Sequence, residues 1–340
     1  MTKSFISVVI PTWREGRVLR RCLNSLLAQD YPKNKFEIII VSHRKLRINE
    51  KEIKTIRITK DTNHAEARNI AVQNARGEII AFCDDDCILP ADWLSSASTY
   101  FATKEIDLLG GPAVSPKKAP FSYRIGAYLS GSKFAVGPSA PRWRILYPEG
   151  EATPFNLILA NTFVRKKSFE AVGGFDPNQV PCEEDLLYYK LCQRGGKLIY
   201  TPKIACFHPS KPVFLPYAQK VVYYSTGRGV LLAKEPKTSH LAFWIPSLFV
   251  VSLLSLPILA LFSRLALLVL AIMLLVYWVL NFAQAFYIFW FREKDLRVLL
   301  VVPIATLLLH ISYGLGVLRG FLSYKLGKRT AFLMPKIEKA

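Results

Sequence analysis

Three consecutive carboxylates follow an apolar segment in the first third of the chain. Asp84, Asp85 and Asp86 come directly after the run at 78–83, Glu-Ile-Ile-Ala-Phe-Cys. Acids beside an apolar strand are costly unless they are paired or bind a metal ion. Alternate residues of an extended chain face the same way, so Asp84 and Asp86 are expected to point at one ion and Asp85 elsewhere. The triplet predicts a site for Mg²⁺ or Mn²⁺, held partly by protein oxygens and partly by substrate phosphates.

A second acidic cluster lies about one hundred residues further on. Glu183, Glu184 and Asp185 open a predicted helix at 186–194 that Gly195-Gly196 closes. Acids in a first helical turn are often only partners of the helix dipole. A carboxylate here can also accept the proton of an attacking hydroxyl group, while a metal ion neutralises charge on a departing diphosphate. Together the two clusters predict displacement at a carbon that bears a nucleotide diphosphate.

The segments around these clusters alternate between strand-like and helix-like patterns. Strands are predicted at 5–10, 36–42, 53–59 and 78–83, and helices at 19–27 and 64–76. This alternation predicts an α/β fold with a parallel sheet, whose ligands bind outside the carboxyl ends of the strands. One rim should therefore carry three features, namely the aspartate triplet, the loop Pro11-Thr-Trp-Arg-Glu15 and the residues after Val41.

The middle of the chain is harder to interpret. Residues 115–155 combine scattered proline, glycine, tyrosine and basic residues with weak periodicity, which predicts irregular structure. Beyond it the pattern predicts a strand at 156–163, a short helix at 167–172 and a strand at 203–207.

The last hundred residues have the composition of membrane-spanning helices. Three apolar stretches approach or exceed the roughly 20 residues that a bilayer requires; they are Leu241–Phe262, Leu265–Phe291 and Val298–Leu322. The segment 212–236 mixes aromatic and aliphatic residues with lysine and arginine, which predicts an interfacial amphipathic helix. The predicted domains are 1–211 (catalytic), 212–240 (interfacial), 241–325 (about three transmembrane helices) and 326–340 (basic tail). Three crossings place the basic tail outside, against the positive-inside tendency, unless the last segment is re-entrant.

The charge balance favours anionic partners. The chain has 45 Lys and Arg against 25 Asp and Glu, a net charge of +20, which suits phosphates of nucleotides, lipid head groups or nucleic acid. No zinc-finger spacing, RNA-binding signature or basic heptad region is found, so nucleic acid is not expected as a partner.

The cysteines indicate a reducing compartment. There are six, with no C-x-x-C pair, and the apolar run at 5–10 is too short for a secretory signal. The soluble part is therefore expected in the cytoplasm. Cys83 and Cys87 flank the aspartate triplet and resemble a metal pair, but no second thiol pair is evident nearby, and small buried apolar residues are the preferred interpretation.

Taken together, the motifs resemble the family 2 glycosyltransferases, which have the Rossmann-like GT-A fold. The resemblance covers about residues 4–210. It comprises Val-Val-Ile-Pro-Thr-Trp-Arg-Glu at 8–15, Ala65-Glu-Ala-Arg-Asn69, Phe82-Cys-Asp-Asp-Asp86, Pro90-Ala-Asp-Trp-Leu94, Asn161, Gly173-Gly-Phe-Asp176 and the acidic cluster with its Gly-Gly. The pattern His310-Ile-Ser-Tyr-Gly-Leu-Gly316 also resembles the membrane segment of succinoglycan-type exopolysaccharide glycosyltransferases.

The resemblance implies a role for individual residues. Asp84 and Asp86 would bind the metal and the diphosphate, joined by His208, and one acid of the 183–185 cluster would be the base of an inverting displacement. Asp185 is ranked first because the family's base is usually an aspartate; counting back from Gly195-Gly196 favours Glu184 instead. The donor nucleotide would be bound by residues of the rim, namely Pro11, Thr12, Glu15, Ser42, Arg68, Asp84, Asp85 and Asp86.

The sequence also departs from the family. Many members end the second strand with an aspartate that contacts uracil, whereas this strand ends Val41-Ser42-His43-Arg44, so the donor base stays open. The Q-x-x-R-W motif of processive synthases is absent.

The leading hypothesis is a metal-dependent inverting glycosyltransferase, an integral protein of the cell membrane with a cytoplasmic catalytic domain. It would move a sugar from a nucleotide-sugar to a polyprenyl-linked acceptor in polysaccharide or glycan assembly. The alternatives are a polyprenyl-phosphate glycosyltransferase that makes a lipid-linked monosaccharide, a nucleotidyltransferase, and a membrane scaffold or transport protein with an inactive domain. The sequence does not indicate the sugar, the nucleotide or the oligomeric state.

Overall fold

The computed structural model describes residues 3–48, 50–116 and 118–327. The chain divides into two compact units. The sheet unit comprises Met1–Lys117 and Ser139–Pro209, and the helical unit comprises Lys118–Pro138 and Ser210–Ala340. The boundary at 209 lies close to the predicted 211, but the excursion at 118–138 interrupts the continuous first domain that the sequence suggested. Most of the basic tail predicted at 326–340 lies outside the described residues.

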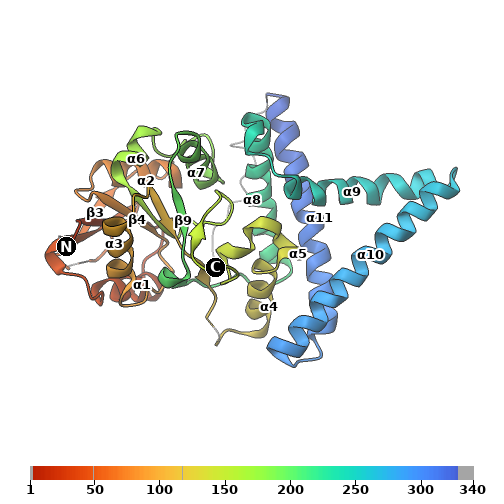
Figure 1. The fold of residues 1–340 in the computed structure, drawn as a ribbon, viewed down its shortest axis with the longest axis horizontal. Helices are drawn as coiled ribbons and strands as arrows, with labels where there is room; N and C mark the ends of the chain where they lie inside the picture. Colours follow the sequence, from red (N-terminus) through yellow and green to blue (C-terminus); the bar gives the residue numbers. More distant parts are fainter. Residues whose placement is uncertain (1–2, 49, 117, 328–340) are drawn as a thin grey trace. The chain divides into compact units, whose positions relative to one another are not determined.

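The sheet unit is built on a mixed sheet (Figure 1). The strand order is β3-β2-β1-β4-β8-β5-β9-β7, with β1 at Ile6–Pro11, β2 at Phe36–Ser42, β3 at Ile53–Arg57, β4 at Ile79–Cys83, β5 at Leu108–Gly110, β7 at Gly150–Glu151, β8 at Asn161–Arg165 and β9 at Leu198–Tyr200. The first four strands are parallel, as predicted. Strand β8 runs antiparallel to both β4 and β5, so the sheet is not wholly parallel. Strands β6 (Ala113–Val114) and β10 (Cys206–Phe207) form a separate parallel pair.

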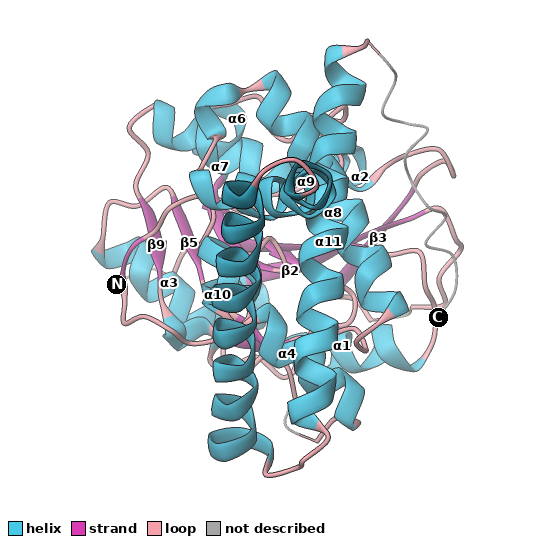
Figure 2. Cartoon of the chain, turned by 90° about the vertical axis from the view of Figure 1, so that its right-hand side faces the viewer, coloured by secondary structure: helices cyan, strands magenta, loops and turns pink. Residues whose placement is uncertain are grey.

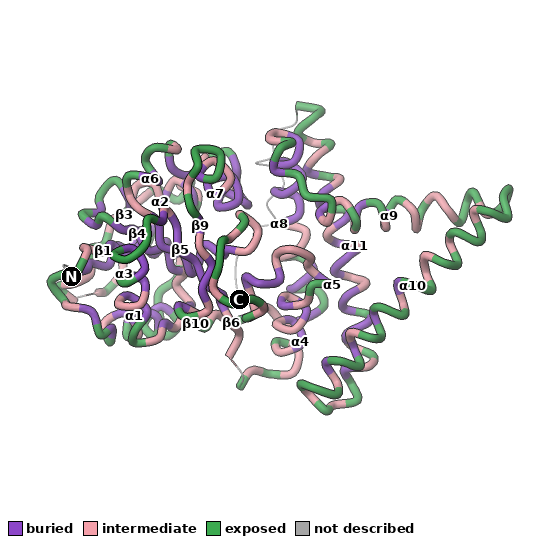
Figure 3. The backbone as a smooth tube through the Cα atoms, in the orientation of Figure 1, coloured by how far each residue is buried: buried purple, intermediate pink, exposed green. Residues whose placement is uncertain are grey.

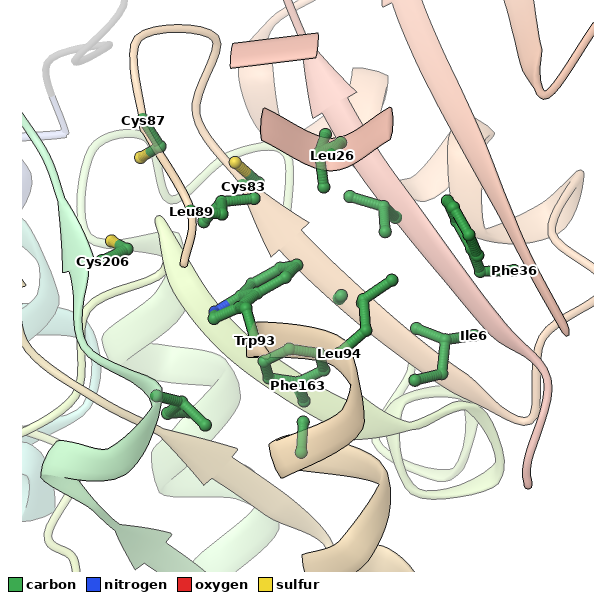
Figure 4. Close-up of a cluster of buried hydrophobic side chains, with 14 of the residues drawn as sticks. Ile6, Leu26, Phe36, Cys83, Cys87, Leu89, Trp93, Leu94, Phe163 and Cys206 are labelled. Atoms are coloured by element: carbon green, nitrogen blue, oxygen red, sulfur yellow. The ribbon is translucent and has the colours of Figure 1, made fainter. Parts of the chain in front are cut away.

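Helices bury both faces of this sheet. Alternate residues of β1 point to opposite sides, so that Ile6, Val8 and Ile10 join one core and Val9 the other. The first core lies under α1 (Arg17–Leu27) and α3 (Trp93–Thr103), and the second under α2 (His64–Gln73), α6 (Lys166–Ala171) and α7 (Glu183–Gln193). Figure 4 shows Trp93 of the first core against Phe163 of β8, with their ring centroids 4.4 Å apart. Each such buried apolar side chain stabilises the fold by roughly 1.5–3 kcal/mol.

Within residues 118–327, the described part of the helical unit has three helices long and apolar enough to cross a membrane. These are α9 (Leu241–Ala260), α10 (Arg264–Ile288, continued as a π-helix over Phe289–Glu293) and α11 (Val298–Lys325). Their bounds agree with the predicted spans to within a few residues. Large apolar residues along α9 and α10 are exposed, which suits a lipid environment. Much of both helices is coloured as exposed in Figure 3.

The excursion at 118–138 is helical, so the irregular structure predicted at 115–155 is wrong for this part. It forms α4 (Phe121–Ser130) and α5 (Lys133–Val136). Arg124 and Tyr128 of α4 both donate to Glu293 at the end of α10, at 2.6–3.1 Å. His310 of α11 contacts the carbonyl oxygen of Phe134 at 3.1 Å. Partners more than 150 residues away thus stabilise this segment.

The segment predicted to be interfacial forms α8 (Leu215–Lys234), which lies beside α11 in Figure 1 and Figure 2. Nine consecutive residues, Ser225–Ala233, are buried, which does not agree with a helix lying on a membrane with one polar face in water. Glycines allow the close approach: a Cβ on Gly229 would lie 2.1 Å from the carbonyl oxygen of Val317, and one on Gly320 would lie 2.0 Å from that of Thr226. Small residues at helix contacts are typical of membrane proteins.

Gly229→Leu is therefore expected to destabilise the helical unit by at least about 1–3 kcal/mol, because the added side chain must displace backbone atoms of α11. The measurement is the apparent Tm of the detergent-solubilised full chain. Gly150→Ala serves as the control, since a Cβ there meets no atom within 4 Å. Equal Tm values for the two variants would contradict the tight α8–α11 contact.

Candidate active site

The aspartate triplet lies at the carboxyl end of β4, on the same edge as the ends of β1 and β2. Its backbone is a turn, not an extended segment, because the Cys87 amide donates to the Asp84 carbonyl at 3.2 Å. The side chains of Asp84 and Asp86 nevertheless approach one group, the ring of His208. Nε2 of His208 lies 3.7 Å from Asp84 Oδ2 and 3.2 Å from Asp86 Oδ1. The two carboxylates therefore approach one ring, although the backbone between them is a turn and not the expected extended segment.

Strand pairing holds His208 in this place. Ile88, just after the triplet, exchanges backbone hydrogen bonds of 2.8 and 2.9 Å with Phe207. The ring of Trp143 lies edge-on to that of His208, with centroids 5.8 Å apart. Burial lowers the pKa of His208, but Cys87 and the carboxylates of Asp84 and Asp86 outweigh it and raise the pKa to about 9. The ring therefore behaves as a cation beside the two acids when no metal ion is bound.

Arg68 joins the two acidic clusters. It lies on α2, which begins with a capping box: Glu66 N donates to Asn63 Oδ1 at 3.0 Å, and Asn63 N donates to Glu66 Oε2 at 2.9 Å. The Arg68 guanidinium is 3.3 Å from Asp84 Oδ1 and 2.9 Å from Glu183 Oε1. Burial raises the pKa of Asp84, but the hydrogen bond from His208 and the charge of Arg68 outweigh it and hold that pKa well below its usual range.

The middle aspartate has a different partner. Thr12 Oγ1 donates to Asp85 Oδ2, which ties the loop after β1 to the triplet. Pro11 ends β1, Ser42 Oγ accepts from the Arg44 amide at 3.1 Å, and Glu15 Oε1 accepts from the Arg47 amide at 3.2 Å. Of the predicted rim residues, Thr12 contacts Asp85 and Arg68 contacts Asp84, while Ser42 and Glu15 make local contacts in the loops.

The second acidic cluster forms the first turn of α7, and each acid in it is almost fully buried. Glu183 pairs with Arg68, and Asp185, 1% exposed, pairs with Arg142. Glu184 Oε1 lies 3.6 Å from the same Arg142. Burial, then repulsion by Asp185 and Glu183, raises the pKa of Glu184 to about 8.

Arg142 is a site residue that the sequence did not predict. It ends a short 3₁₀ helix, Gly137–Arg142, in the segment predicted to be irregular. Its Nε donates to the Phe155 carbonyl at 2.9 Å, and the side chain is 10% exposed. A lone arginine among prolines belongs to no motif, so only the fold reveals its pairing with α7.

Three aromatic side chains meet where β1, β2 and α2 converge. The ring centroid of Trp13 is 4.1 Å from that of His64 and 6.3 Å from that of His43. Nδ1 of His43 is buried and has no hydrogen-bond partner among the described residues. Such a cluster can stack on a planar heterocycle.

The donor set beside β4 suits a divalent metal ion. Asp86 Oδ1 is buried and lacks a hydrogen-bond partner in the described chain apart from its ionic contact with His208. One oxygen of Asp86, Sγ of Cys87 and a ring nitrogen of His208 lie within 4.8 Å of one another. Carboxylate and imidazole are ordinary ligands of divalent ions.

Comparisons with known proteins agree with this geometry. Residues 7–170 match the family model described as glycosyl transferase family 2. Glycosyltransferase AglE of Haloferax volcanii is 26% identical over 62% of this chain and 69% of its own length. The O-antigen chain rhamnosyltransferase RfbN of Salmonella typhimurium is 27% identical over 65% of this chain and 71% of its own length. Mannosyltransferase PcManGT of Pyrobaculum calidifontis, solved with GDP-Man and Mn²⁺, has a TM-score of 0.63 at 16% identity, covering 95% of this chain and 88% of that one, which shows a shared fold.

Proposed function

We propose that this chain, a glycosyltransferase with a family 2 match over residues 7–170 and a GT-A fold, transfers a sugar by metal-dependent direct displacement from a nucleotide-sugar to a lipid-linked acceptor. The observation that carries the proposal is the convergence of Asp84, Asp86 and His208, joined through Arg68 to the carboxylates of α7. A displacement that releases a diphosphate needs positive charge beside the departing diphosphate. It also needs a base beside the attacking hydroxyl group, on the opposite side of the reacting carbon.

Asp84, Asp86 and His208 would hold the metal ion. Its chemistry is to neutralise charge on the departing diphosphate. Arg68 adds a fixed positive charge beside Asp84, which keeps that carboxylate ionised. Thr12 and Asp85 couple the loop after β1 to the same site.

We assign the base to Glu184. The resemblance to the family had ranked Asp185 first, because the family's base is usually an aspartate. Asp185 is 1% exposed and paired with Arg142, and Glu183 is paired with Arg68 at 2.9 Å. Glu184 has the longer contact of 3.6 Å to Arg142, and its raised pKa of about 8 makes it a better proton acceptor than an ordinary carboxylate once ionised. The glycine-anchored alignment favours the same residue.

The cluster of Trp13, His43 and His64 is proposed to stack on the donor's base. It lies at the ends of the strands where the nucleotide of such folds binds. His43, the residue after β2, has an Nδ1 with no hydrogen-bond partner among the described residues, and this atom is proposed to contact the base.

The helical unit supports the proposal that the sugar acceptor is a lipid in the membrane. Helices α9, α10 and α11 are long and apolar enough to span a bilayer. If α9 and α10 both cross, the segment before α9 and the loop with Arg292, Lys294 and Arg297 lie on one side, and the positive-inside tendency assigns that side to the cytoplasm. A polyprenyl-linked acceptor would then be held by the same membrane as the enzyme.

The test is a donor screen with the purified full chain in detergent or vesicles. Nucleoside diphosphate release from each nucleotide-sugar is followed with Mn²⁺ or Mg²⁺, with EDTA, and with or without polyprenyl phosphate and polyprenyl-diphosphate-linked sugar. We expect release that needs both the ion and a lipid acceptor. Full turnover in excess EDTA would contradict metal dependence, and equal turnover without lipid would contradict the proposed acceptor.

A further inference from the structure

The residue that follows the aspartate triplet is a cysteine whose sulfur lies at the proposed ion site. Sγ of Cys87 is within 4.8 Å of an oxygen of Asp86 and a ring nitrogen of His208. Ligand atoms around a four-coordinate ion with bonds of about 2.0–2.3 Å stand roughly 3.3–3.8 Å apart. The 3.2 Å between His208 Nε2 and Asp86 Oδ1 is close to that spacing. Binding of one ion by all three atoms would require Sγ of Cys87 to approach these two from separations of up to 4.8 Å.

Backbone hydrogen bonds fix both sides of this group. The turn closed by Cys87 N and the Asp84 carbonyl at 3.2 Å brings Cys87 back toward Asp86. The next residue, Ile88, pairs with Phe207 and so holds His208 opposite. The three donors therefore come from two segments that are already paired with each other, which limits the rearrangement that ion binding would need.

We infer that Cys87 is a sulfur ligand of the ion, and that the site consequently prefers Co²⁺, Zn²⁺ or Cd²⁺ over Mg²⁺. Thiolate ligands select borderline and soft ions, whereas sites made only of carboxylate, carbonyl and water oxygens suit Mg²⁺. When sulfur binds the ion, the metal–sulfur bond replaces the S–H bond and the proton passes to solvent. The inference rests on the proposed metal-dependent function and adds the chemical class of the ion.

Alternatively, Cys87 is a small apolar core residue. The neighbouring buried cysteines are examples of that role. Cys22 and Cys83 donate their thiols to the Asp84 carbonyl at 3.5 and 3.2 Å. Figure 4 shows the sulfurs of Cys83 and Cys206 in the same core as Cys87. Cys87 shares this environment in part, since its thiol interacts with those of Cys206 and Cys83 and contacts Ala160 O at 3.7 Å. Within the described chain it is nonetheless the cysteine whose sulfur groups with a carboxylate oxygen and a histidine nitrogen, all within 4.8 Å of one another.

The test is Co²⁺ binding to the purified full chain in detergent, followed by absorption spectroscopy. A Co²⁺–thiolate bond gives a charge-transfer absorption in the near ultraviolet that oxygen and nitrogen ligands do not give. We expect this absorption in the wild type, its loss in Cys87→Ser and Cys87→Ala, and its retention in two controls. Cys206→Ser tests a buried neighbouring thiol, and Cys192→Ser tests an exposed one. Unfolding curves recorded without metal establish that each variant is folded.

Affinity supplies a second readout that does not depend on turnover. In Cys87→Ser, the Kd for Cd²⁺ should rise about tenfold or more, while the Kd for Mg²⁺ should change by less than about threefold. A wild type without the Co²⁺ absorption, or a folded Cys87→Ser that retains it, would overturn the inference. Ion-dependent sugar transfer in such a wild type would leave the proposed function standing, whereas turnover in EDTA would contradict the proposed function itself.

Discussion

Replacement of Glu184 by glutamine is expected to lower kcat by about 10²–10⁴-fold, the usual contribution of a general base. Glutamine keeps the size of the side chain and removes its basicity, so the KM for the donor should change little. The partner experiment is Asp185→Asn. Because Asp185 is paired with Arg142 and 1% exposed, its amide variant should reduce turnover by less than about tenfold. A folded Asp185→Asn that is inactive, beside an active Glu184→Gln, would restore the ranking by family identity.

The pH profile provides an independent check on the same residue. Burial and the neighbouring acids raise the pKa of Glu184 to about 8, so the protonated, inactive form predominates below that pH. The kcat/KM of the wild type should therefore rise with pH through about 8. Arg142 opposes this shift, so Arg142→Gln should move the rise to higher pH. A profile that falls as pH increases through this range would contradict the assignment of the base.

Asp86→Ala is expected to reduce kcat/KM by about 10³-fold, because the several kcal/mol that an ion contributes to a departing diphosphate are lost. Activity should not recover at high Mn²⁺ concentration if Asp86 is a ligand. Asp30→Ala is the matched control, since Asp30 is an exposed acid at the end of α1, where no site residue was found. The measurement is the rate of nucleoside diphosphate release as a function of Mn²⁺. Activity within tenfold of wild type with an unchanged Mn²⁺ dependence would exclude Asp86 from the site.

The first half of the sheet could be predicted because the sequence patterns that identify its strands lie within short, continuous segments. Strands β1, β2 and β4 are short apolar runs, and the helix α1 between β1 and β2 has a clear apolar face. The rim position of Asp84–Asp86 then follows from strand direction alone. The antiparallel direction of β8 could not be deduced, because it depends on pairing with β4 and β5 from distant parts of the chain.

Residues 115–155 show where local patterns stop being informative. Helix α4 is stabilised by the contacts of Arg124 and Tyr128 with Glu293. Arg142 can be recognised as a site residue only from its contacts with Asp185 and Glu184. None of these pairings produces a periodic pattern in the sequence. Conversely, motif resemblance predicted that Asp84, Asp86 and His208 share a metal site. In the structure the two carboxylates lie within 3.7 Å of the His208 ring, although the expected extended backbone is a turn.

The choice among Glu183, Glu184 and Asp185 illustrates the same limit. Their identities favour Asp185, but the first turn of a helix points its side chains in different directions, about 100° apart. Arg68 and Arg142 each take one acid as a close partner, and this leaves Glu184 with the weakest contact. The three acids therefore differ in their ion-pair partners, which the residue types alone do not indicate.

The decisive measurement is the stoichiometry and configuration of the product from the full chain in vesicles with a nucleotide-sugar, Mn²⁺ and a polyprenyl acceptor. Base-assisted direct displacement predicts one nucleoside diphosphate released per sugar recovered in the lipid extract, with the anomeric configuration opposite to that in the donor. Release of pyrophosphate, retention of configuration, or nucleoside diphosphate release without sugar in the lipid extract would contradict it.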